Sequence, residues 1–182
     1  MSEVVRLTLV SHGMTEAMSA GRFPTDEPLN ALGIRQVESG IDLDAADSAA
    51  CGPEKRARQT AELLGLQPRT EPDLADLDHG RWRGDHLGRV DPAELALWLT
   101  DAGAAPHGGE SVVDLMVRVR RWLDAVSVQR GRIVAVTHPA VIRAAVLVTL
   151  DAPPKSFWRI DIGPASVSVL HFRGHAWTLR VT

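Results

Sequence analysis

RIVAVTHPAVIRAAVLVTL, residues 132–150, predicts a buried strand that leads directly into an apolar helix. Residues 132–137 carry a nearly continuous apolar run, which is typical of a strand in the middle of a parallel sheet. Pro139 suits the first turn of a helix, where its missing N–H costs nothing. The helix over residues 139–150 is nearly all apolar, so a sheet must cover it. This strand–helix unit indicates an α/β layered fold.

Strands and helices alternate in the rest of the chain as well. Further strands are expected over residues 4–10 and 46–51, and two closing strands around residues 167–169 and 177–181. Helices are expected over residues 30–40, 53–64, 91–100 and 110–126, and a loop over residues 11–28. A length of 182 residues favours one domain, residues 1–182. We therefore expect a three-layer α/β sandwich with a mainly parallel central sheet flanked by helices.

Composition narrows the range of partners. The 20 basic residues against 23 acidic ones leave a net charge of −3, which gives no overall positive field for nucleic acid. No segment approaches the roughly 20 apolar residues of a membrane helix, and the N-terminus lacks the apolar run of a secretory signal. We expect a cytoplasmic protein with no nucleic-acid or membrane partner. Arg118, Arg120 and Arg121 are interpreted as a solvated helix face.

Two histidines occupy matching places in this pattern. His12 follows the first predicted strand and His138 follows the strand over residues 132–137. If those strands are neighbours, both imidazoles emerge at the edge of the sheet where α/β proteins bind ligands. Gly13 allows close backbone approach by a ligand, and the helix that begins at Pro139 favours an anion at its amino end. Paired histidines facing an anion suggest phosphoryl transfer.

Five segments extend this pattern through nearly the whole chain. They are SHGMTEAMSAGRFPTDEPLNALG (11–33), GPEKRARQTAELL (52–64), DLADLDHGRWRG (73–84), GGES (108–111) and AVTHPAVIRAAV (135–146). In this order they resemble the histidine phosphatase superfamily, the phosphoglycerate mutase-like proteins. Each segment alone is weak, but five in order are specific.

The resemblance implies roles for individual residues. His12 is expected to attack phosphorus and carry the phosphoryl group, since a neutral imidazole is nucleophilic near neutral pH. Arg56 and His138 are expected to hold the phosphate oxygens, and Asp76 to act as general acid and base. Asp78 is the competing candidate for the acid. Further candidate phosphate-binding residues are Ser11, Gly13, Thr15 and Arg22.

Four positions depart from the family pattern. Ser11 stands in place of the signature arginine, and Met18 stands where an asparagine is common. Gly52 replaces a usual serine, and Pro139 replaces a usual glycine. Serine cannot supply a charged, two-pronged donor to phosphate. Losing one such donor costs on the order of 3–4 kcal/mol, or roughly 10²–10³ in rate, unless another cation substitutes. The arginines that are candidates for this substitution are Arg22, Arg58, Arg83 and Arg143.

The resulting hypothesis is hydrolysis of a small phosphorylated metabolite through a phosphohistidine, without metal or organic cofactor. One alternative is a catalytically impaired family member that binds a phosphorylated ligand or partner. A mutase ranks lower, because the short connection from Asp76 to Gly108 leaves little material for a helical cover over the substrate. His79, His86 and His107 show no metal-ligand spacing. Trp98 is expected to pack in the core or to line a pocket mouth. A homodimer of this chain is a further candidate assembly.

Overall fold

A single mixed sheet forms the middle layer of the computed structural model, which describes residues 4–181. The strand order is β3 (Arg69–Thr70), β2 (Ser48–Cys51), β4 (Arg132–Thr137), β1 (Val5–Ser11), β5 (Val167–Phe172) and β6 (Trp177–Arg180). The strands β3, β2, β4 and β1 run parallel, whereas β5 pairs antiparallel with β1 and β6 antiparallel with β5. The predicted mainly parallel sheet is confirmed, with an antiparallel hairpin added at one edge.

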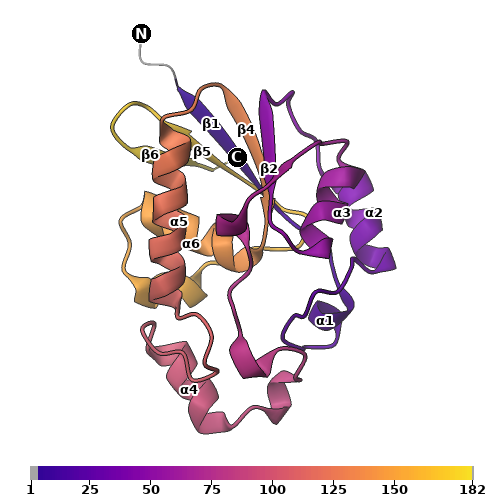
Figure 1. The fold of residues 1–182 in the computed structure, drawn as a ribbon, viewed down its shortest axis with the longest axis vertical. Coiled ribbons are helices and arrows are strands. Elements are labelled where there is room, and N and C mark those ends of the chain that lie inside the picture. Colours follow the sequence, from indigo (N-terminus) through magenta and orange to yellow (C-terminus); the bar gives the residue numbers. More distant parts are fainter. Residues whose placement is uncertain (1–3, 182) are drawn as a thin grey trace.

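Helices cover both faces of the sheet (Figure 1). One layer contains α2 (Ala31–Gly40) and α3 (Lys55–Leu63), and the other contains α5 (Val112–Ser127) and α6 (Pro139–Thr149). Successive strand residues alternate between these layers. Val134 and Val136 of β4 therefore pack with α3, whereas Ile133 and Ala135 join the larger core under α5 and α6. The expected three-layer sandwich is thus confirmed.

Side-chain caps explain why the predicted helices begin where they do. Asn30 Oδ1 accepts a hydrogen bond from the Gly33 amide at the start of α2. Ser111 and Asp114 form a reciprocal capping box at the start of α5. The Asp91 side chain caps α4 (Pro92–Thr100) by accepting hydrogen bonds from the Ala93 and Glu94 amides. The segment expected to be only loop contains a further short helix, α1 (Glu16–Ser19), which Thr15 caps.

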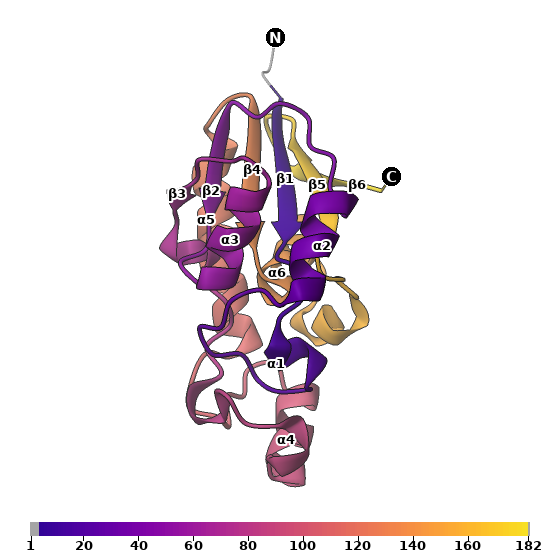
Figure 2. The same cartoon turned by 90° about the vertical axis from the view of Figure 1, so that its right-hand side faces the viewer.

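A small cap projects from the carboxyl ends of the parallel strands (Figures 1 and 2). It consists of α4 and the short 3₁₀ turns η2 (Gly80–Trp82) and η3 (Leu87–Arg89). Trp82 and Trp98 meet edge to face inside it, with ring centroids 5.6 Å apart. The short connection after Asp76 therefore contains one helix and two 3₁₀ turns, more material than the little that was expected there. No helix within residues 4–181 has the length and apolar character needed to cross a bilayer.

Candidate active site

The two predicted histidines meet at the carboxyl edge of the sheet. Strands β1 and β4 are neighbours in parallel register, with Ser11 opposite Thr137, so the residues that follow both strands emerge side by side. The His12 and His138 ring centroids are 5.1 Å apart at an angle of 63°. Their exposed fractions are only 3% and 0%. Residues distant in the sequence thus form one buried pair.

The environment of His12 keeps its ring neutral and fixes which nitrogen carries the proton. Nδ1 lies 2.7 Å from the Gly13 carbonyl oxygen, which can only accept, so Nδ1 carries the proton. Burial lowers the pKa of His12 from 6.5 to about 3, helped by the charges of His138 and Arg56. The ring is therefore neutral at physiological pH, and the lone pair lies on Nε2.

Arg56 and Asp76 form an ion pair beside these rings. Arg56 comes from the first turn of α3, is 1% exposed, and places Nη2 2.7 Å from Asp76 Oδ2. The same carboxylate oxygen lies 3.5 Å from His138 Nδ1. Burial alone would raise the pKa of Asp76, but the charges of His138 and Arg56 outweigh it and hold the pKa well below its usual range. Asp76 is consequently ionised in this site.

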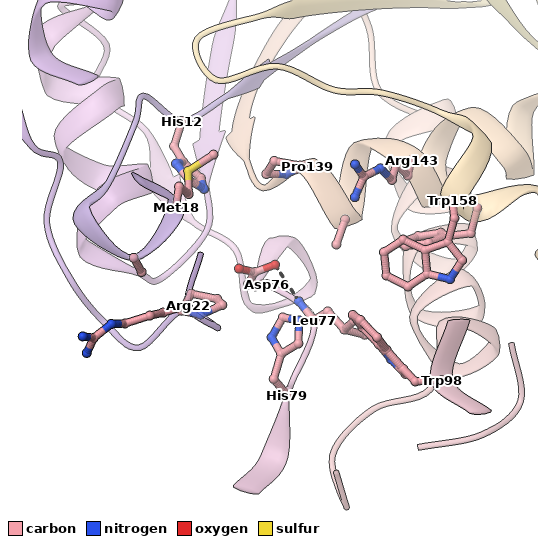
Figure 3. A pocket seen from close by; sticks show the side chains of 14 residues that line it. His12, Met18, Arg22, Asp76, Leu77, His79, Trp98, Pro139, Arg143 and Trp158 are labelled. Carbon is pink, nitrogen blue, oxygen red and sulfur yellow. Dashed lines mark hydrogen bonds between the residues drawn. The ribbon is translucent and has the colours of Figure 1, made fainter. Parts of the chain in front are cut away.

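A cavity of about 580 Å³, open to solvent, adjoins His12. Figure 3 shows His12 and Met18 on one side of Asp76, and the indoles of Trp98 and Trp158 on the other. Trp98 comes from α4, whereas Trp158 belongs to the 3₁₀ segment η4 (Pro154–Arg159). The cavity therefore combines a polar end around the nucleophile with an aromatic wall, as small-molecule sites commonly do.

Comparison with known proteins agrees with this geometry. Residues 7–182 match the histidine phosphatase superfamily (branch 1). The chain belongs to this superfamily. The solved complex of mycobacterial glucosyl-3-phosphoglycerate phosphatase with VO3 is similar to this histidine phosphatase fold, with a TM-score of 0.86, 28% identity and coverage of 97% of each chain.

Two relatives known by sequence show different extents of match. The adenosylcobalamin/alpha-ribazole phosphatase of Salmonella typhimurium is 31% identical over 195 residues, covering 97% of this chain and 95% of the relative. A bifunctional protein of Mycobacterium tuberculosis is 31% identical over 182 residues, covering 92% of this chain and 50% of the relative. This histidine phosphatase chain therefore spans about half the length of the first relatives it matches. Several relatives are named phosphatases, which places phosphomonoester hydrolysis within the superfamily.

Ser11, which the resemblance places where the family has an arginine, is fully buried. Ser11 is 0% exposed, and its Oγ has no hydrogen-bond partner among the described residues. Arg143 of α6 lines the cavity from the other side of Pro139 (Figure 3). Its Nε donates to the Ile160 carbonyl at 2.7 Å, whereas its two terminal nitrogens form no hydrogen bond or ion pair with residues 4–181. Arg143 is therefore the cation best placed to serve beside Arg56.

The other candidate phosphate-binding residues have different surroundings. The Gly13 amide donates to Thr60 Oγ1, and a Cβ on Gly13 would lie 2.6 Å from the Gly33 carbonyl oxygen. The Gly13 backbone thus packs closely against the backbone of Gly33. Thr15 caps α1 and donates to Glu27, so its hydroxyl is used within the fold. Arg22 lines the cavity rim but is exposed, and its guanidinium points away from Asp76 in Figure 3.

The remaining candidates lie outside this cavity. Asp78 is exposed and accepts a hydrogen bond from the Gly80 amide, which leaves Asp76 as the carboxylate next to His12. Arg58 and Arg83 are also exposed and do not line the cavity.

Glu54 is a site residue that sequence reasoning missed. Its Oε2 lies 2.7 Å from His138 Nε2, and its Oε1 accepts from the Asp76 amide at 2.9 Å. Burial favours a higher pKa for Glu54, but the hydrogen bond and charge of His138 outweigh it and lower the pKa. A Cβ on Gly52 would lie 3.0 Å from both Glu54 Oε2 and His138 Nε2. Glycine in place of the family's serine at position 52 is the sequence feature that could have indicated Glu54, because it leaves room for the contact between Glu54 and His138.

The interpretation of Arg118 as part of a solvated face of α5 is wrong, because its guanidinium contacts other segments of the protein. Its Nη1 donates to the carbonyl oxygens of Asp73 and Ala75 at 2.8 and 2.9 Å. Its Nε and Nη2 donate to the two carboxylate oxygens of Glu110. Arg118 therefore fixes the backbone directly before Asp76, whereas Arg120 is exposed as expected.

Proposed function

We propose that this chain hydrolyses a small phosphomonoester through a phosphorylated His12. The observation that carries the proposal is the buried, neutral His12 ring, with Nε2 free, next to Arg56 and His138. A neutral nitrogen nucleophile beside fixed donors is what phosphoryl transfer requires, since most of its catalysis is positioning and charge stabilisation.

The reaction proceeds in two displacements. The Nε2 lone pair forms a bond to phosphorus while the bond from phosphorus to the leaving oxygen breaks, and that oxygen takes a proton from Asp76. Water then attacks phosphorus, loses a proton to Asp76, and the N–P bond breaks with its electron pair returning to His12. Arg56, His138 and the free amides at the start of α6 stabilise the phosphoryl oxygens in both steps.

Asp76 must gain a proton before it can act as an acid. In the ligand-free site Arg56 and His138 keep this carboxylate ionised. A phosphate dianion that binds Arg56 removes the attraction of the guanidinium and adds negative charge next to the carboxylate. Both changes raise the pKa of Asp76. Substrate binding therefore converts an ion-pair partner into a proton donor.

Arg143 compensates for Ser11 in this proposal. A single guanidinium, that of Arg56, would otherwise face the dianion, and its Nη1 and Nη2 already contact Thr25 and Asp76. Arg143, which lines the cavity, adds a second positive charge that acts on Asp76, the ion-pair partner of Arg56. The charge lost at strand β1 is thus supplied from helix α6.

The test measures both turnover and the covalent intermediate. Wild type is mixed with a chromogenic aryl phosphate, and the protein is denatured in base and examined by intact mass for one added phosphoryl group. The matched variants are His12→Asn and His175→Asn, since His175 is exposed in the turn before β6. We expect turnover and phosphorylation in wild type and His175→Asn only. Equal rates in wild type and His12→Asn would remove His12 from the mechanism.

The second candidate function is that of a catalytically impaired protein that binds a phosphorylated ligand without hydrolysing it. Two observations favour it: Ser11 offers a neutral hydroxyl where the resemblance implies a cation, and Arg56 is already paired with Asp76. This alternative requires that wild type bind a phosphomonoester without turnover and that Ser11→Arg create turnover. Rapid hydrolysis by wild type excludes it.

A further inference from the structure

The aromatic wall of the cavity identifies the chemical class of the leaving group. We propose that the physiological substrate carries a flat, largely apolar leaving group, an alcohol bearing an aromatic ring system, which packs on Trp158 and Trp98. This inference rests on the proposed function, because it concerns the alcohol released when His12 is phosphorylated.

Reaction geometry decides which side of the cavity receives this group. The attacking and leaving oxygens or nitrogens lie roughly in line through phosphorus, so the leaving oxygen departs away from His12 Nε2. Asp76, which protonates it, lies between His12 and the two indoles in Figure 3. The alcohol therefore extends past Asp76 toward Trp98 and Trp158.

The wall on that side is rigid and apolar. The Trp98 and Trp158 ring centroids are 4.5 Å apart at 65°, and the Phe157 and Trp158 centroids are 4.8 Å apart at 87°. Phe157 is 1% exposed and Trp98 is 6% exposed, so packing holds both rings. Leu77 continues the same surface. The partly exposed Trp158 indole therefore offers a fixed contact surface to a flat ligand at little entropic cost, and the edge of Trp98 adjoins it.

The polar groups of the cavity do not suit a polyol. Within residues 4–181 no serine, threonine, asparagine or glutamine side chain lines this cavity. The polar side chains that line it are His12, Arg22, Asp76, His79 and Arg143, and none of them belongs to the aromatic wall. A sugar or an amino acid alcohol would therefore find no hydrogen-bond partner along that wall, which disfavours its binding there. The guanidinium carbon of Arg143 lies 5.7 and 5.8 Å from the ring centroids of Phe157 and Trp158. Arg143 thus lies where the phosphoryl end of the cavity meets the aromatic wall.

The test compares two phosphomonoesters of equal chemical reactivity. Both 2-(1-naphthyl)ethyl phosphate and glycerol 3-phosphate release a primary alkoxide, so a difference in kcat/KM reports recognition of the leaving group. We expect wild type to prefer the naphthyl ester by more than tenfold. Trp158→Ala should raise KM roughly tenfold more for the naphthyl ester than for glycerol 3-phosphate, while Trp158→Phe restores most of the difference. Trp177→Ala is the matched control, since Trp177 packs on Phe172 in the β5–β6 hairpin.

The outcomes separate this inference from the proposed function. A preference of wild type for glycerol 3-phosphate, or equal losses on both esters in Trp158→Ala, would overturn the aromatic leaving group. If wild type hydrolyses neither ester, the proposed function fails, and calorimetric titration with the naphthyl ester decides the inference. Binding that weakens in Trp158→Ala but not in Trp177→Ala then supports the aromatic subsite. Absence of binding refutes it.

Discussion

Replacing His12 by asparagine should change how the stability of the protein depends on pH. Burial holds the pKa of His12 at about 3 in the folded protein, whereas the unfolded chain has the ordinary value of 6.5. Between these two values the unfolded state binds one more proton than the folded state, so stability falls as pH falls. Asparagine does not titrate, and this part of the pH dependence should disappear.

The size of the effect follows from the two pKa values. Each pH unit in the window contributes about 1.4 kcal/mol, so wild type should lose about 2 kcal/mol between pH 7 and pH 5 from this ring alone. Burial also lowers the pKa of His79, His107 and His171, which adds a slope of the same sign. Those three residues are present in both proteins, so their contribution cancels in the difference. Asp76 titrates below this window.

Urea unfolding of wild type and His12→Asn at pH 7, 6 and 5 measures this difference directly. The absolute stability of the variant is irrelevant, because only the change with pH is compared. We expect the free energy of unfolding of wild type to fall about 2 kcal/mol further than that of the variant. Parallel pH profiles for the two proteins would refute the buried, neutral state of the nucleophile.

Three further changes test other parts of the site. Asp76→Asn should lower kcat roughly 10²–10³-fold on an alkyl phosphate but much less on a nitrophenyl phosphate, whose leaving group needs no proton; equal losses would contradict the acid role. Arg143→Gln should lower kcat/KM roughly 10²–10³-fold, and Arg22→Gln less than about threefold; the reverse order would place the second cation at the rim. Arg118→Ala should lower kcat about tenfold with little change in KM and speed amide hydrogen exchange at residues 73–77, with partial rescue by lysine. Unchanged exchange would show that Arg118 does not position Asp76.

The layered fold was predictable because local signals and burial agree. The continuous apolar run of β4 and the amphipathic period of α5 each identify an element without knowledge of its neighbours. The caps at Asn30 and Ser111 mark helix starts within one residue. The short helix α1 was missed, because four residues between turns carry too little periodicity to be recognised.

The site was predictable only where a motif or a strand end places a residue. His12 and His138 meet because two parallel strands end together, which a sequence pattern can anticipate. Arg118 has the same spacing as its exposed neighbours, and only the path of residues 73–76 decides that its guanidinium is used. Glu54 and Trp158 likewise depend on which segments the tertiary fold brings beside them.

The resting contact between Asp76 and Arg56 makes the cavity selective for the valence of an anion. To bind Arg56, chloride or acetate must displace the Asp76 carboxylate, whose negative charge then stays nearby without a partner. One monovalent anion merely replaces another, so the attraction to Arg56 does not increase. Only a divalent group gains enough attraction from Arg56 and Arg143 to offset the eviction. In the proposed mechanism, the carboxylate returns to the Arg56 guanidinium when inorganic phosphate leaves the site. Monovalent salts should therefore compete poorly for this pocket, whereas inorganic phosphate, itself a dianion, can displace the carboxylate as the substrate does.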